Sequence, residues 1–190
     1  MSTINVAMLG AGGVGKTCVL LRLTRKSFDP EYIPTIQDHF EAKILAMERE
    51  FILKIVDTAG QDEMADIAGI AIQSSEAFIL VYSITSTISL NEVEKYRSKI
   101  LSLKPGAEGK MILVGNKCDL ENDRQVPREK GQSLADSWGI PFFETSAKEN
   151  INIETIFQDL AIASTKKVNS NAQSAETQEQ ADTNCSCNIA

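Results

Sequence analysis

The stretch Gly10-Ala11-Gly12-Gly13-Val14-Gly15-Lys16-Thr17, near the start of this 190-residue chain, decides the fold. It follows an apolar run, residues 4–9, that is typical of a buried strand, and it precedes residues 18–23, whose apolar spacing is helical. A strand, a G-x-x-x-x-G-K-T turn and a helix together predict a phosphate-binding loop. The glycines let backbone N–H groups turn toward an anion, Lys16 brings charge to the β- and γ-phosphates, and Thr17 offers a hydroxyl to Mg²⁺. The loop alone predicts a nucleotide without saying which one.

The composition limits which classes of protein this chain can belong to. The chain is 43% hydrophobic and carries a net charge of −7, with a pI near 4.8. Its length suits one buried domain, and its acidity argues against a nucleic-acid-binding surface. No apolar run reaches the roughly 18 residues of a membrane span. The four cysteines, at positions 18, 118, 185 and 187, lack a metal-binding spacing, which indicates free thiols in a reducing compartment.

Apolar strands alternate with helical stretches along the chain, which predicts an α/β fold. We expect a P-loop NTPase three-layer fold, with a six-stranded, mostly parallel sheet, one antiparallel edge strand and five flanking helices. Strands are expected near residues 3–9, 39–45, 51–56, 77–82, 111–115 and 141–144. Helices are expected near residues 16–25, 87–103, 128–138 and 152–167, with one more after residue 61. The connection between 39–45 and 51–56 is too short for a crossover helix, so these strands should pair antiparallel. Residues 77–82 and 111–115 should be central strands and 141–144 a peripheral one.

A second motif, Asp57-Thr58-Ala59-Gly60-Gln61, follows the strand predicted at 51–56. A carboxylate at the end of a strand beside the phosphate loop suits a partner of Mg²⁺, which points to Asp57. Gly60 lets the backbone approach a γ-phosphate, and Gln61 can orient an attacking water. D-x-x-G is a common turn by itself; its position one hairpin after the phosphate loop favours the functional interpretation.

Two further motifs identify the base. Asn116-Lys117-Cys118-Asp119 follows the strand at 111–115, and Thr145-Ser146-Ala147-Lys148 follows the strand at 141–144. The Asp119 carboxylate can accept hydrogen bonds from the N1–H and the N2 amine of guanine, a donor pair that adenine lacks. Backbone N–H groups of the last motif can bind the guanine O6. Since all four motifs stand at the carboxyl ends of predicted strands, they predict a guanine nucleotide site there.

With these motifs, residues 3–167 resemble small GTPases of the Ras superfamily, and within it the Ras/Rap branch. The resemblance implies a membrane-anchored GDP/GTP switch in signal transduction. It implies that Thr35 binds Mg²⁺ together with Thr17 and Asp57. It also implies that Phe28 packs edge-on against the guanine; the alternative is that Phe28 is a core aromatic residue. The GTP contacts that it implies are Gly13, Val14, Gly15, Lys16, Thr17, Cys18, Phe28, Tyr32, Thr35, Gly60, Asn116, Lys117, Asp119, Ser146, Ala147 and Lys148.

By the same resemblance, Gln61, Lys16 and Gly12 serve catalysis. Gln61 holds the water, and Lys16 stabilises charge on the β,γ-bridge. Gly12 leaves room for an arginine of a GTPase-activating protein, which contributes roughly 10³–10⁵ in rate. The motifs contain no arginine finger of their own, so intrinsic hydrolysis should be slow. Gln61 also favours the Ras side of the branch.

The resemblance implies an effector region, Tyr32-Ile33-Pro34-Thr35-Ile36-Gln37-Asp38-His39-Phe40. Two positions that are acidic in Ras are Ile33 and Gln37 here, while Asp38 keeps its carboxylate. Effectors with a Ras-binding-type domain use basic residues and strand addition at this edge, so we expect weaker electrostatic steering. His39 should face solvent.

The segment after Gln61 departs further from the family. Met64, Ala68 and Ala71 replace polar residues that anchor this helix to guanine nucleotide exchange factors, and Gly69 weakens the helix by about 1 kcal/mol. This leaves two hypotheses, a cycling switch and a nucleotide-loaded binding module that cycles little.

Gly12 and Gln61 favour the cycling switch. A small P-loop ATP enzyme is a third hypothesis, which Asp119 and the absence of an obvious lid disfavour. We expect a monomer.

The composition divides the chain into a guanine-nucleotide-binding domain at 1–167 and a disordered tail at 168–190. The tail ends in Cys187-Asn188-Ile189-Ala190, which fits a C-a-a-X box and predicts prenylation of Cys187, with the terminal Ala favouring farnesyl. One lipid chain binds weakly, so palmitoylation of Cys185 is the expected second signal. The alternatives are an incidental cysteine and a doubly prenylated Rab-like tail. We expect the cytoplasmic face of the plasma membrane, with a cytosolic pool.

Overall fold

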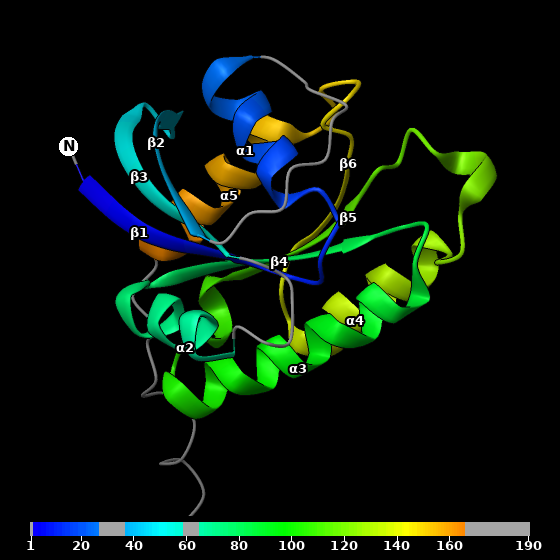
Figure 1. The fold of residues 1–190 in the computed structure, drawn as a ribbon. Coiled ribbons are helices and arrows are strands. Elements are labelled where there is room, and N and C mark those ends of the chain that lie inside the picture. The colour runs from blue at the N-terminus through cyan, green and yellow to red at the C-terminus, as the bar shows by residue number, and fades with distance from the viewer. Residues whose placement is uncertain (1, 27–36, 59–64, 166–190) are drawn as a thin grey trace, which may run out of the picture.

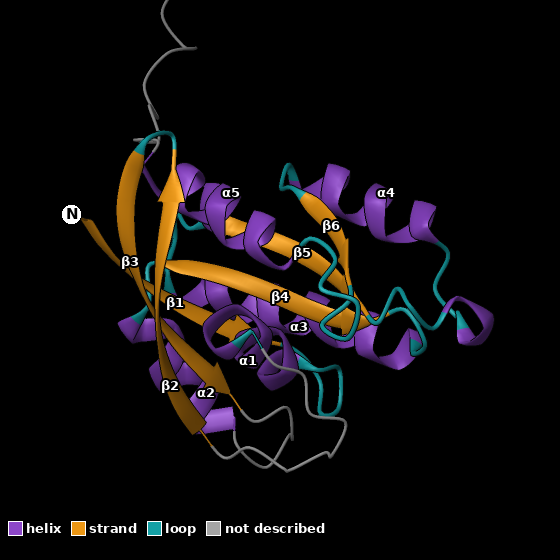
Figure 2. Cartoon of the chain, turned by 90° about the horizontal axis from the view of Figure 1, so that it is seen from above, coloured by secondary structure: helices purple, strands orange, loops and turns teal. Residues whose placement is uncertain are grey.

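The computed structural model describes residues 2–26, 37–58 and 65–165. Within these ranges a six-stranded sheet lies between two groups of helices (Figure 1). One face carries α1 (Lys16–Arg25) and α5 (Ile153–Thr165); the other carries α2 (Ala65–Ser74), α3 (Thr87–Leu103) and α4 (Arg128–Trp138). Figure 2 views the sheet from the side of α1 and α5, with α2 and α3 behind the strands.

The strand order is β2-β3-β1-β4-β5-β6. The strands are β1 (Ser2–Leu9), β2 (Gln37–Ala46), β3 (Arg49–Thr58), β4 (Ala77–Ser83), β5 (Met111–Asn116) and β6 (Phe142–Thr145). β2 pairs antiparallel with β3 at one edge, and every other pairing is parallel. The predicted fold class is therefore confirmed, with β4 and β5 in the interior of the sheet and β6 at its other edge.

The central strands are buried on both faces, which is why they read as unbroken apolar runs in the sequence. Alternate side chains enter different cores. Ile79 and Val81 pack with α1 and α5, whereas Phe78, Leu80 and Tyr82 pack with α2, α3 and α4. Both cores position the carboxyl ends of the parallel strands at one edge of the sheet.

The turn between β2 and β3 is tight and has an unusual sequence. Ala46 pairs with Arg49, so Met47 and Glu48 form a two-residue loop. Both have positive φ, 49° and 59°. Such turns favour glycine or asparagine because a Cβ is strained in this conformation. The hairpin is therefore formed at a conformational cost at its tip.

The predicted tail with Cys185 and Cys187 lies outside the described residues. So do Phe28, Tyr32 through Ile36, Gly60 and Gln61. Across the described ranges, no helix has both the length and the apolar character needed to cross a membrane.

Candidate functional site

The four sequence motifs meet at one edge of the sheet, where the parallel strands end. The phosphate loop follows β1, and Asp57 lies near the end of β3. Asn116 is the last residue of β5, and Thr145 is the last residue of β6. Hydrogen bonds join these segments although they are far apart in the sequence. The roles of the individual residues stay predictions.

Two glycines shape the phosphate loop through close backbone contacts. Gly15 precedes α1 with a φ of 95°, and a Cβ there would lie 2.5 Å from Asn116 Nδ2. A Cβ on Gly10 would lie 2.0 Å from the carbonyl oxygen of Val81 on β4. Neither position admits a side chain. The loop therefore lies directly against the ends of β4 and β5.

The first turn of α1 carries no negative charge that would compete with an anion. The helix has no side-chain cap and no acidic residue in its first turn, which holds Thr17 and Cys18. The positive end of the helix dipole lies at this N-terminus and favours an anionic ligand. Gly12 and Gly13 are exposed, whereas Val14 is buried. The arrangement suits a phosphate group at the start of α1.

Lys16 is buried, with 6% of its surface exposed, beside this helix start. Its Nζ donates to the carbonyl oxygens of Gly10, at 2.8 Å, and Ala11, at 3.0 Å. Burial lowers the pKa of Lys16 to about 8, against the opposing effect of the Asp57 carboxylate. A buried ammonium group bonded to neutral carbonyls is well placed to receive a negatively charged ligand.

Half-buried Thr17 and buried Asp57 form a pair that fits a divalent cation. Thr17 Oγ1 donates to Asp57 Oδ2 at 2.5 Å, while Oδ1 has no hydrogen-bond partner among the described residues. Burial raises the pKa of Asp57, as does the charge of Asp38; the Thr17 bond and the Lys16 charge oppose this. A hydroxyl beside a carboxylate oxygen without a donor matches the oxygen ligands of Mg²⁺. The third predicted ligand, Thr35, lies outside the described residues.

Asn116 and Lys117 bind the phosphate loop. Asn116 is buried, and its Nδ2 donates to the carbonyl oxygen of Val14 at 2.8 Å. Its Oδ1 accepts from Thr145 Oγ1 at 3.0 Å. Lys117 Nζ donates to the carbonyl oxygen of Gly13 at 2.7 Å. Residues 116 and 117 of the N-K-x-D motif therefore bond to the phosphate loop, and Asn116 also bonds to the end of β6.

Asp119 is held by the loop that follows β6. Ser146 Oγ donates to Asp119 Oδ1 at 2.6 Å and accepts from the backbone N–H of Glu149 at 3.0 Å. Ser146 and Ala147 are buried and Lys148 is exposed. The carboxylate predicted to read guanine thus has a fixed orientation set by a buried hydroxyl.

Sequence reasoning missed an ion pair that supports this loop. Arg124 donates to both carboxylate oxygens of Glu144 on β6, at 2.6 and 3.1 Å, and to the carbonyl oxygen of Val126 at 3.0 Å. Its bonds to the carboxylates of Glu121 and Glu144 raise the pKa of Arg124 above its ordinary value. No motif spacing signals this pair, because it depends on how β6 packs beside the segment after β5.

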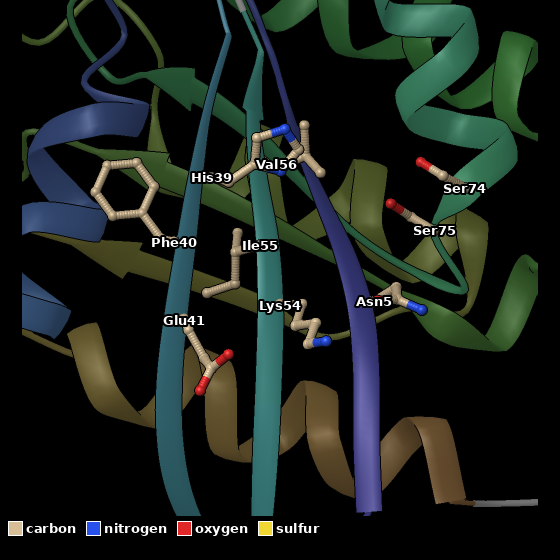
Figure 3. A pocket seen from close by; sticks show the side chains of 9 residues that line it. All are labelled: Asn5, His39, Phe40, Glu41, Lys54, Ile55, Val56, Ser74 and Ser75. Atoms are coloured by element: carbon tan, nitrogen blue, oxygen red, sulfur yellow. The ribbon is translucent and has the colours of Figure 1, made fainter.

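The described part of the predicted effector region lies on the edge strand β2. Asp38 and His39 are exposed and Phe40 is half-buried. In the described sheet, β2 pairs only with β3, so the other side of its backbone has no strand partner. Figure 3 shows a pocket of about 340 Å³ on the exposed face of β1, β2 and β3 that includes His39 and Lys54; the Ser75 side chain faces it from the end of α2.

The structure changes the interpretation of α2. Ala68 and Ala71 are 5% and 1% exposed and pack in the core with α3. Their small side chains thus let α2 lie close to the sheet. Ile70 is 63% exposed and Gly69 is half-buried, so these two positions add apolar surface to the solvent side of α2. Met64 lies outside the described residues.

A comparison with models of protein families matches the Ras family over residues 5–166. The match covers all four motifs and nearly all of the described sheet and helices. Members of this family are small GTPases, which bind GTP and GDP, typically with Mg²⁺, and act with regulators and effectors. The fold, the converging motifs and this match agree, and the chain belongs to the Ras family.

Proposed function

We propose that the protein is a GDP/GTP switch in signal transduction that hydrolyses GTP slowly alone and faster with a GTPase-activating protein. One observation carries the proposal: a fixed carboxylate, Asp119, and the Lys16–Thr17–Asp57 group, whose lysine and aspartate are buried, meet at the same sheet edge. The first suits a guanine base, and the second suits a phosphate with a cation. Membership of the Ras family supports the same conclusion.

Binding follows from groups that the structure describes. Asp119 accepts from the N1–H and N2 amine of guanine, and the backbone N–H groups of Ala147 and Lys148 donate to O6. Lys16 exchanges its carbonyl partners for phosphate oxygens, a stronger charge-assisted bond. The backbone donors at the start of α1 add to the same phosphates. Base and phosphates are thus bound by different segments.

Hydrolysis adds residues whose roles come from the resemblance. Thr17, Asp57 and Thr35 would hold Mg²⁺, which supplies positive charge against the phosphate oxygens. Gln61 orients the attacking water, and Lys16 stabilises the charge that develops on the leaving group. Gly12 is exposed, which leaves the loop surface open to an arginine from an activating protein.

Single-turnover hydrolysis of bound GTP tests this proposal. The wild-type protein is expected to hydrolyse GTP slowly, and an activating protein to accelerate it by about 10³-fold or more. Gln61→Leu should keep GTP bound but lose this acceleration, whereas Gln132→Leu, on the exposed face of α4, should keep it. Unchanged turnover in Gln61→Leu would contradict the role of Gln61. If the wild-type protein binds GTP but does not hydrolyse it, and does not release GDP when loaded with it, the result would support the alternative of a nucleotide-loaded binding module that cycles little.

Effector binding is proposed at the edge strand β2. A partner strand can pair with its open backbone side, and Asp38 supplies a negative charge. Ile33 and Gln37 lower the charge of this region, which should reduce the association rate more than the dissociation rate. We expect Gln37→Glu to raise the association rate of a Ras-binding-type domain at low salt. An equal rate in both proteins would contradict this.

A lipid anchor is proposed at the C-terminus. Prenylation of Cys187, with farnesyl favoured, gives marginal binding by itself, and palmitoylation of Cys185 adds a second chain. We propose the cytoplasmic face of the plasma membrane as the location, with a cytosolic pool. Mass spectrometry of the full chain from cells should find a prenyl group on Cys187 and none in Cys187→Ser. Cys185→Ser protein that stays at the plasma membrane would contradict the second signal.

A further inference from the structure

Arg22, on α1, connects the helix of the phosphate loop to the base motif. Its side chain is half-buried and donates three hydrogen bonds, all to backbone carbonyl oxygens. Nε donates to Ala147 at 2.7 Å, Nη2 to Lys148 at 2.8 Å and Nη1 to Lys26 at 3.1 Å. None of the four motifs includes this arginine, and the proposed mechanism does not use it.

A chain of hydrogen bonds runs from Arg22 to the carboxylate of Asp119. The Lys148 C=O and the Glu149 N–H belong to one peptide unit, which is trans, so they point in opposite directions. Arg22 binds this C=O, and the Glu149 N–H donates to Ser146 Oγ at 3.0 Å. The Ser146 hydroxyl then donates to Asp119 Oδ1 at 2.6 Å. Each bond polarises the next, so the chain fixes the orientation of the carboxylate.

The bond from Arg22 to the carbonyl oxygen of Ala147 orients the backbone N–H of Lys148. The C=O of Ala147 and the N–H of Lys148 share a peptide unit, so the bond from Arg22 Nε turns this N–H to the side away from Arg22. The Lys148 N–H is one of the proposed donors to the guanine O6. Arg22 therefore orients both kinds of group that recognise the base.

An arginine suits this position better than other cations. Its planar fork presents donors in several directions, which matches carbonyls of two separate segments. Arg22 makes no ion pair within the part of the chain that the structure describes. Its charge faces carbonyl oxygens, and a lysine at this position would bond to fewer of them.

We propose that Arg22 is a positioning residue that holds Asp119 and the β6–α5 loop in the geometry that reads guanine, and thereby slows nucleotide release. The inference rests on the proposed guanine-nucleotide binding. Arg22 touches no nucleotide in this account and acts through Ser146 and the peptide units of Ala147 and Lys148. Loss of Arg22 should therefore affect recognition of the base more than recognition of the phosphates.

Dissociation rates of fluorescently labelled GDP and IDP from the full chain test this role. IDP carries hypoxanthine, which lacks the N2 amine, so the ratio of the IDP rate to the GDP rate reports how well Asp119 is placed. We expect Arg22→Ala to raise the GDP rate about tenfold or more and to move the ratio toward one, with Arg22→Lys intermediate. Arg25→Ala removes an exposed charge from the same helix and should keep both rates within about twofold of wild type.

The outcomes separate the positioning role from a structural one. If Arg22→Ala releases both nucleotides faster at an unchanged ratio, or releases them as wild type does, the positioning role is overturned. Thermal unfolding of the GDP-bound variants identifies any that fail to fold. If Arg22→Ala does not fold, the ratio of the IDP rate to the GDP rate is measured in Arg22→Lys instead. If the wild-type protein retains neither GDP nor IDP, the proposed function and this role are both overturned. If the wild-type protein retains the nucleotides and the Arg22 variants release them at the wild-type rates, only this role is overturned.

Discussion

The two halves of the site differ in where their polar groups find partners. In the base half, residues 116–119 and 145–148, four polar side chains have protein partners. Asn116 and Lys117 bond to the phosphate loop, and Thr145 and Ser146 bond within the base half. In the phosphate half, residues 10–17 with Asp57, the bonds that Lys16 makes to described residues go to carbonyls of its own loop, and Asp57 keeps one oxygen without a described partner. The protein thus builds the base half itself, whereas the phosphate half keeps groups that a ligand and a cation complete.

The largest expected effect is on the phosphate half. Lys16→Ala should weaken GDP binding by about 10²–10³-fold, because it removes a buried charge that no neighbouring residue replaces. Competition titration against a fluorescent nucleotide measures the change. Lys130→Ala, an exposed lysine on α4, is the matched control and should bind GDP as wild type does. A loss of less than about tenfold in Lys16→Ala would break the contrast between the halves.

Removal of Mg²⁺ should also act on the phosphate half. Chelation is expected to speed GDP release from wild type by about tenfold or more, and Thr17→Ala should reduce this effect because it loses one ligand of the cation. Ser146→Ala, in the base half, should release GDP faster but respond to chelation as wild type does. If both variants lose the response to chelation equally, then the halves do not act separately.

A smaller effect distinguishes two buried threonines of the same chemistry. Thr145→Val removes the hydroxyl that donates to Asn116 Oδ1, and Thr58→Val removes the hydroxyl that donates to the carbonyl oxygen of Met8. Each should lower the free energy of unfolding by about 1–3 kcal/mol, measured by urea unfolding of the GDP-bound protein. Thr145→Val should also lower the preference for GDP over IDP, and Thr58→Val should not. The same loss of preference in both would contradict an independent base half.

The sequence predicted the sheet because its signals are local. β4 and β5 are unbroken apolar runs, and the short connection between β2 and β3 permits only an antiparallel pair. The motifs were likewise found by spacing within a few residues. The bonds from Arg22 to Ala147 and from Asn116 to Val14 join residues more than 100 positions apart. They depend on how α1 and the loops pack, which no local pattern contains.

In helix α2, the sequence already contained the spacing of a buried helix face. Ala68 and Ala71 were interpreted as lost contacts to exchange factors, whereas the structure places both against the core with Ile72. Their spacing of three and four residues is that of the buried face of a helix. Small apolar residues at such a spacing indicate close packing before they indicate a missing partner.

The smallest expected effect lies away from both halves, at the β2–β3 turn. Glu48 has a φ of 59°, where glycine is unstrained, so Glu48→Gly should raise the free energy of unfolding by about 0.5–1 kcal/mol. Glu50→Gly, in the extended strand β3, should lower it by a similar amount, about 0.5–1 kcal/mol. Neither change should alter GDP release. A lower stability of Glu48→Gly in urea unfolding would contradict the strain at this turn.

The nucleotide bound to the purified full chain tests the central claim most directly. Chromatography of the nucleotide released by denaturing the protein, purified with Mg²⁺ present, identifies the base and its amount. We expect a guanine nucleotide at about one per chain, held by the fixed Asp119 and the Lys16–Thr17–Asp57 group. An adenine nucleotide in its place, or no retained nucleotide after loading with GDP and Mg²⁺, would contradict it.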